Sequence, residues 1–222
     1  MWITLKAKSA LIFAFLFLAG TCFCLATVNK SIHIADNQTV HGGLSSVNGS
    51  IHIGNSCTVG GSSHTVNGRI EVGDGSRVDD LRTVNGSIRI GRRVIVNGLV
   101  KTTNGSLACD MGSEIMRELR TTNGSIKLAG TKVGGGLTTV NGDVAVLDQS
   151  RVRGDIVIRG RGGSWFFGIF GHRRHPITIR VEGGSVVEGG IIVEDHHRNV
   201  EVIVSKDSKI QGRVINAKII ER

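Results

Sequence analysis

The chain has 222 residues, of which 27 are basic and 18 acidic, and its formal net charge is +9. It contains 32 glycines but one proline, no tyrosine and only 4% aromatic residues, which argues against a globular core built on large aromatic side chains. The positive charge favours anionic partners, such as lipid head groups or acidic glycans.

Residues 1–26 have the pattern of a secretory signal peptide. Two lysines precede an apolar run over 10–18, and a small-x-small sequence at 24–26 predicts cleavage before Thr27. The alternative is an uncleaved N-terminal membrane anchor, since the apolar stretch is at the short limit for spanning a bilayer. Either form predicts an exported protein of the periplasm or cell envelope, for which nucleic acid is not an expected partner.

Residues 27–158 repeat one phrase, Val/Thr-Asn-Gly-Ser-Ile, at a nearly fixed period. Successive asparagines are 18 or 19 residues apart, and they are Asn29, Asn48, Asn67, Asn85, Asn104, Asn123 and Asn141. A period of this length is typical of a solenoid, in which each repeat is one unit stacked on the next. Helical repeats and propeller blades are longer.

Each repeat alternates apolar and polar residues, as in Ile88-Arg89-Ile90 and Ile126-Lys127-Leu128, and is rich in β-branched residues. This is the pattern of short strands. The sequence therefore predicts an all-β, single-stranded parallel β-helix (a β-solenoid) with two or three strands in each turn, here called a rung. A second phrase, Val-x-Gly-x-Leu, recurs after the last Asn-Gly and predicts irregular rungs and a cap over 177–222.

Two placements of the repeated asparagine are open. In a regular strand, Val84, Gly86 and Ile88 face inward, whereas Thr83 and Asn85 face outward. Alternatively the asparagine lies at a corner and points inward, so that the amides of successive rungs form a ladder. Asn-Gly is a strong bend signal, which favours the corner. Both placements give the repeat a structural role.

These phrases resemble those of the bacterial DUF4097-type β-strand-repeat proteins and, more loosely, of the bactofilins, which are polymer-forming cytoskeletal proteins. The resemblance covers about 28–158 and, less closely, 177–220. It implies a right-handed β-helix and, from the bactofilins, end-to-end assembly into filaments. It implies no catalytic residues. A cleavable signal and an inserted loop are departures that put filament formation in doubt.

Residues 159–176 interrupt the repeats with a glycine-rich insertion. It combines aromatic and basic side chains, of which we select Trp165, Phe166, Phe167, Phe170, Arg159, Arg161, Arg173 and Arg174 as a candidate interaction loop. Insertions in solenoids emerge on one face, which is often the binding face. Such a loop would contact a membrane surface or an anionic envelope polymer. The alternative is that its aromatic residues fold back over the solenoid.

No metal, cofactor or catalytic site is expected from the remaining residues. His33 and His52 share an offset and should stack on adjacent rungs, but a metal site needs three or four converging ligands. Cys57 and Cys109 lie three rungs apart, roughly 14 Å, which is too far for a disulfide.

The sequence thus favours a non-enzymatic structural or scaffold protein of the bacterial envelope, either monomeric or self-associating. The alternative is a binding module that recognises an envelope glycan or membrane surface through the 159–176 loop or a Thr/Asn/Ser face. An envelope-polysaccharide enzyme is supported by fold analogy alone.

Overall fold

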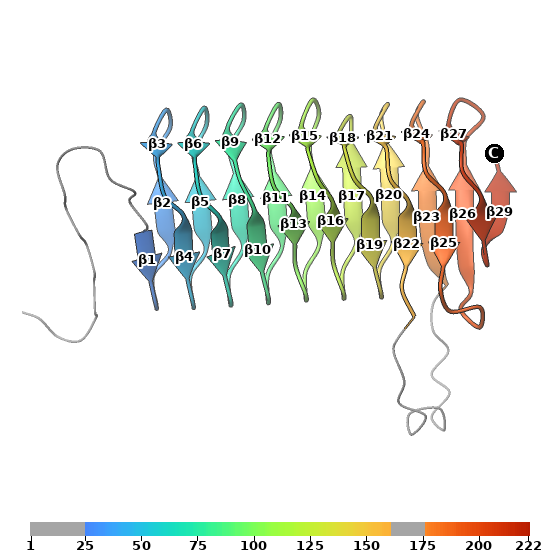
Figure 1. Ribbon diagram of the computed structural model, residues 1–222, viewed down its shortest axis with the longest axis horizontal. Coiled ribbons are helices and arrows are strands. Elements are labelled where there is room, and N and C mark those ends of the chain that lie inside the picture. Colours follow the sequence, from blue (N-terminus) through green and yellow to red (C-terminus); the bar gives the residue numbers. More distant parts are fainter. Residues whose placement is uncertain (1–24, 161–175) are drawn as a thin grey trace, which may run out of the picture.

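The computed structural model describes residues 25–160 and 176–222, which form an elongated all-β solenoid (Figure 1). Three parallel sheets, here called A, B and C, run along its length, so each rung contributes up to three short strands. The predicted fold class is therefore confirmed. None of the described residues forms a helix long and apolar enough to cross a membrane.

Sheet A contains ten strands, one from each rung. They are β1 (Leu25–Thr27), β4 (Leu44–Ser46), β7 (Ser63–Thr65), β10 (Leu81–Thr83), β13 (Val100–Lys101), β16 (Leu119–Arg120), β19 (Leu137–Thr139), β22 (Ile156–Ile158), β25 (Ile191–Val193) and β28 (Val214–Ile215).

Sheet B also contains ten strands. They are β2 (Ile32–Ile34), β5 (Ile51–Ile53), β8 (Ile70–Val72), β11 (Ile88–Ile90), β14 (Leu107–Cys109), β17 (Ile126–Ala129), β20 (Val144–Leu147), β23 (Ile177–Val181), β26 (Val200–Val204) and β29 (Lys218–Glu221).

Sheet C contains nine strands. They are β3 (Thr39–Val40), β6 (Thr58–Val59), β9 (Arg77–Val78), β12 (Ile95–Val96), β15 (Glu114–Ile115), β18 (Lys132–Val133), β21 (Arg151–Val152), β24 (Val186–Val187) and β27 (Lys209–Ile210).

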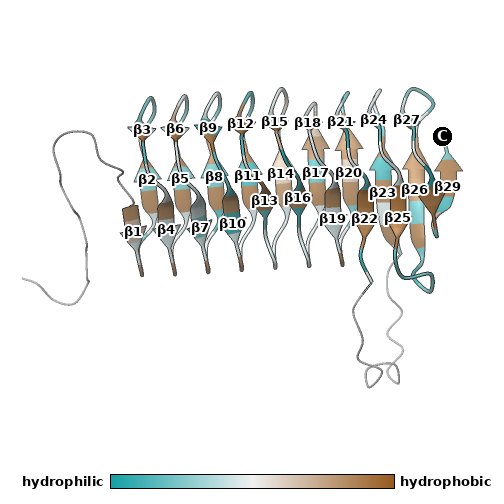
Figure 2. Ribbon diagram, viewed as in Figure 1, coloured by the Kyte–Doolittle hydropathy of each residue, from teal (hydrophilic) through white to brown (hydrophobic). Residues whose placement is uncertain are grey.

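The core is a set of aliphatic columns that run along the solenoid axis. In sheet B, for example, Ile51, Ile70 and Ile88 stack in register and are all buried. Arg89, between two buried isoleucines, is exposed, as the alternation predicts. Because each side chain packs on its equivalents in the rungs before and after, no large aromatic residue is needed. Figure 2 shows the resulting mixture of hydrophobic and hydrophilic residues along the strands.

The two 18-residue spacings shorten the rung at two different corners. Between sheets C and A, five residue steps separate Thr58 from Ser63, whereas four separate their partners Arg77 and Leu81. Between sheets B and C, Cys109 and Glu114 are likewise five steps apart, but Leu128 and Lys132 only four. In both cases the rung is one residue shorter outside its strands, so the pairing between strands of successive rungs is preserved.

Repetition continues past the insertion. Ile179 of β23 pairs with Val144 of β20, although 35 residues separate them, and β26 and β29 then extend sheet B to Glu221. The chain leaves the stack after Gly160, between sheets A and B, and re-enters at Pro176.

Candidate functional site

The repeated asparagines lie at the corner between sheets A and B. The side-chain amide of each donates to the Oδ1 atom of the asparagine one rung earlier, in six hydrogen bonds of 2.8 Å, which link Asn29, Asn48, Asn67, Asn85, Asn104, Asn123 and Asn141. A primary amide suits this role because it both donates and accepts. The expected inward direction is wrong: Asn29 to Asn123 are exposed and Asn141 is partly exposed.

The ladder has two different ends. At its C-terminal end, the Arg198 guanidinium donates to the Oδ1 atom of Asn141 at 2.6 Å, so this end is capped by a cation from a later rung. At the other end, Asn29 accepts from Asn48, and the described residues before it provide no further asparagine. The insertion occupies the next corner between sheets A and B, so the ladder ends at Asn141. The Oδ1 atom of Asn141 is satisfied by Arg198.

A buried hydroxyl column supports the corner from inside. Thr65, Thr83 and Thr102 each donate from Oγ1 to the glycine carbonyl of the preceding rung's Asn-Gly, at 2.8 Å. This explains why a threonine recurs two positions before the asparagine of the repeat. It also corrects the strand placement, in which Thr83 was expected outside and Val84 inside: Thr83 is buried and Val84 is 41% exposed. The corner separates two strands, so the alternation does not run through it.

Thr102→Val should lower the free energy of unfolding by about 1–2 kcal/mol, since it keeps the side chain's shape but removes its hydrogen bond to the Gly86 carbonyl. Chemical denaturation of the variant and wild type would measure this. The control is Thr122→Val, since Thr122 is only half-buried, with an expected change within about 0.5 kcal/mol. Equal costs at both positions would contradict a supporting role for the buried hydroxyls.

The candidate interaction loop falls mostly outside the described residues. Trp165, Phe166, Phe167, Phe170, Arg161, Arg173 and Arg174 are not described, so both interpretations of the loop stay predictions. Arg159 is described: its Nε atom lies 3.9 Å from a Glu194 carboxylate oxygen, and the Gly160 N–H donates to the same carboxylate at 3.2 Å. The segment that leads into the insertion is thus fixed to the next rung.

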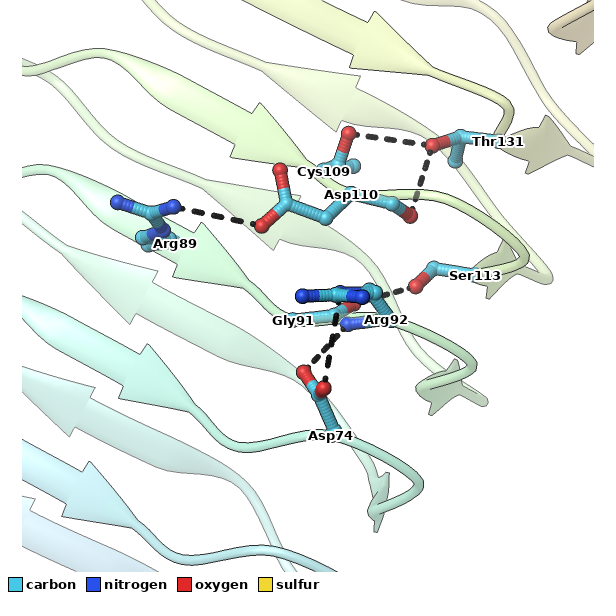
Figure 3. A network of polar contacts seen from close by, with 8 residues as sticks. All are labelled: Asp74, Arg89, Gly91, Arg92, Cys109, Asp110, Ser113 and Thr131. Carbon is cyan, nitrogen blue, oxygen red and sulfur yellow. Dashed lines mark hydrogen bonds and ion pairs between the residues drawn. The ribbon is translucent and has the colours of Figure 1, made fainter.

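The turns between sheets B and C hold a second polar column (Figure 3). Ser113 Oγ donates to the Gly91 carbonyl, while the Arg92 N–H donates to Asp74 at 2.8 Å. At the N-terminal end of this column, hydrogen bonds from the backbone and side-chain amides of Asn55 lower the pKa of the Asp36 carboxyl. These contacts join each turn to the turn of the neighbouring rung.

Cys57 and Cys109 are buried free thiols, so no disulfide joins them. Burial raises the pKa of the Cys109 thiol well above its usual range, so this thiol is unreactive at neutral pH.

The histidines stack as expected, with the His33 and His52 rings parallel and 4.6 Å apart. His52 Nδ1 also lies 2.8 Å from Glu71. Within 25–160 and 176–222, however, no group of three or more His, Cys, Asp or Glu side chains is placed to hold a metal ion.

Sequence reasoning missed a groove on the outer face of sheet A, with a volume of about 470 Å³. Its lining includes His64, Arg82 and Lys101, with the exposed valines Val66 and Val84 beside them. The sequence pattern that could have identified this groove is the spacing of its basic residues. Each of the three lies three positions before an asparagine of the ladder.

Comparison with protein-family models, with curated proteins and with solved structures finds no match to this chain. The assignment of function therefore depends on the geometry of the solenoid itself.

Proposed function

We propose that this protein is a non-enzymatic structural solenoid of the bacterial cell envelope, which self-associates through its N-terminal rung. The observation that carries the proposal is the difference between the two ends of the stack. A sheet edge presents unpaired backbone groups and needs a cap or a partner. One end has features of a cap and the other is an ordinary repeat.

The C-terminal rung departs from the repeat in two ways that blunt it. Glu221 pairs with Val204 and so occupies a position that is apolar in the preceding rungs. The corner between sheets A and B is also shorter, and Asn216 donates there from its side chain to the Val193 carbonyl at 2.9 Å. Charged edges and irregular ends oppose edge-to-edge pairing.

The N-terminal rung, formed by β1, β2 and β3, has regular repeat geometry and lies at the edge of all three sheets among the described residues. The Ile32 N–H and the Ile34 carbonyl bond to the second rung. Because alternate residues of a parallel strand bond to opposite sides, the N–H and C=O of His33 point away from the stack. A second copy of the chain could pair with them.

The predicted signal cleavage would increase the number of unpaired backbone groups at the N-terminal end. Leu25 and Ala26 pair with Leu44 and Ser45 in sheet A, so cleavage before Thr27 would remove two of the three residues of β1. The exported protein would then present part of β4 as well. The resemblance to DUF4097-type proteins and bactofilins agrees with an envelope solenoid that assembles. A solenoid that associates through only one of its ends, however, forms dimers rather than filaments.

His33→Pro tests the proposal, because proline removes an N–H that points away from the second rung and would bond only to a second copy of the chain. We expect the wild-type protein to sediment as a dimer in analytical ultracentrifugation and the proline variant as a monomer with an unchanged circular dichroism spectrum. His33→Ala, which keeps the N–H, is the control and should still dimerise. A wild-type monomer, or dimers that persist in the proline variant, would overturn the proposal; filaments in electron micrographs would show that both ends assemble.

A further inference from the structure

Four basic side chains follow one another on the outer face of sheet A. His64 pairs in register with Arg82, Arg82 with Lys101, and Lys101 with Arg120, so the four belong to successive rungs about 4.8 Å apart. Like charges directly opposite each other on neighbouring strands are unfavourable. Nothing in the fold requires this arrangement, since the equivalent positions in other rungs are Ser45 and Thr138.

Carboxylates fix the two arginines in place. Arg82 donates to Asp80 at 2.9 Å, and Arg120 donates to Glu118 at 2.7 Å. Asp80 is held in turn, because its Oδ1 atom accepts the N–H of Leu99 at 2.8 Å. Each acid precedes its arginine by two residues and therefore lies on the same face of the strand.

Lys101 lies between the two arginines and differs from them. The position two residues earlier is Leu99, and no ion pair links Lys101 to any described side chain. Its ammonium group therefore faces solvent without a compensating charge, between two oriented guanidinium groups. An uncompensated charge of this kind marks a position that serves binding better than stability.

An apolar row runs beside the basic column. Val28, Val47, Val66 and Val84 are 55%, 41%, 38% and 41% exposed and occupy the same position in successive rungs, next to the asparagine ladder. Thr103 continues the row, and the groove of about 470 Å³ lies where row and column overlap, with Ser62 in its lining. The groove thus combines cations, aliphatic carbon and hydroxyl groups along a line parallel to the axis.

We propose that this groove binds a strand of an acidic polysaccharide that lies parallel to the solenoid axis. Sugar rings present C–H groups for the valines, hydroxyls for Ser62 and Thr103, and carboxylates for Arg82 and Lys101. The rung spacing is close to the length of one pyranose residue in an extended chain, so charges on successive sugars can meet successive rungs. A membrane surface fits less well, because the cations form a single line along a groove, whereas a bilayer presents a broad plane of head groups.

This surface lies on the side of the solenoid and the proposed dimer contact lies at its end, so the two proposals fail independently. The test uses the purified full chain and a fluorescently labelled oligogalacturonate, with binding followed by anisotropy. Lys101→Glu should weaken binding about fivefold to tenfold, because it replaces an attraction with a repulsion. Lys127→Glu is the matched control: it makes the same charge change on the outer face of sheet B, between Ala108 and Ala145, and should leave binding unchanged.

The neutral oligosaccharide of the same length and phosphatidylglycerol vesicles complete the experiment. The proposal expects no measurable binding of the neutral glycan and no vesicle binding that depends on Lys101. It is overturned by failure of the oligogalacturonate to bind, by equal effects of the two lysine substitutions, or by vesicle binding that Lys101→Glu abolishes. Thermal unfolding of both variants, which should match wild type within a few degrees, excludes misfolding as the cause.

Discussion

Replacing Gly105 with alanine is expected to destabilise the solenoid by about 3 kcal/mol or more, a large effect for a single added methyl group. A Cβ atom at this position would lie 2.0 Å from the carbonyl oxygen of Gly86, the equivalent glycine one rung earlier. The obstacle is backbone rather than a flexible side chain, so relief requires the two rungs to move apart. Such movement would also lengthen the bond from the Asn104 N–H to the Val84 carbonyl, which joins the same two rungs.

Urea denaturation followed by circular dichroism would measure this cost. Gly60→Ala is the matched control, since Gly60 also lies at a corner between sheets, but its added Cβ would be 3.2 Å from the nearest atom, the His41 carbonyl oxygen. We expect a change within about 1 kcal/mol there. Similar costs at both positions would mean that the Asn-Gly corner tolerates expansion and that its glycine is not required by close approach.

The architecture could be predicted from the sequence because one residue type marked every rung. Asparagines 18 or 19 residues apart fixed the length of a rung, and the alternation in segments such as Ile88–Ile90 identified its strands. The two shorter spacings carried no information on where a residue was missing. Only the register shows that one loss falls after Arg77 and the other before Lys132, at different corners.

The direction of the corner side chains could not be predicted, because alternation fails where a strand ends. Thr83 continues the inward face of β10, and the chain then turns before β11 begins at Ile88. Val84 and Asn85 belong to this turn and are exposed. A threonine hydroxyl and a valine methyl group are similar in size, so the hydrogen bond to the Gly68 carbonyl, rather than packing, distinguishes the buried position from the exposed one.

The candidate binding surface was missed for a different reason. His64, Arg82, Lys101 and Arg120 are separated by some 18 or 19 residues and form no local motif. Their common offset from the asparagines places them in one column, but whether that column faces solvent depends on the strand before the corner. The insertion is recognisable in the sequence because it interrupts the repeats, whereas these basic residues lie inside rungs of regular length.

The position of a rung in the stack should decide what its core side chains contribute. Ile126→Ala is expected to lower the free energy of unfolding by about 2–5 kcal/mol, because Ile126 is fully buried between Leu107 and Val144. Ile219→Ala makes the same chemical change in the same column of sheet B, but Ile219 is 49% exposed and pairs within the chain with Val202 alone. Its expected cost is below about 1.5 kcal/mol.

The comparison also bears on how the molecules associate. In a stack held together by nearest-neighbour contacts, a weakened central rung can separate the solenoid into two units that unfold at different denaturant concentrations. We therefore expect a broader urea transition for Ile126→Ala and an unchanged transition width for Ile219→Ala. If instead Ile219→Ala is as costly as Ile126→Ala, and its cost rises with protein concentration, the C-terminal rung is covered by a second copy. Association would then use the end that the charge of Glu221 was expected to protect, and the proposed contact at β1, β2 and β3 would be the wrong one.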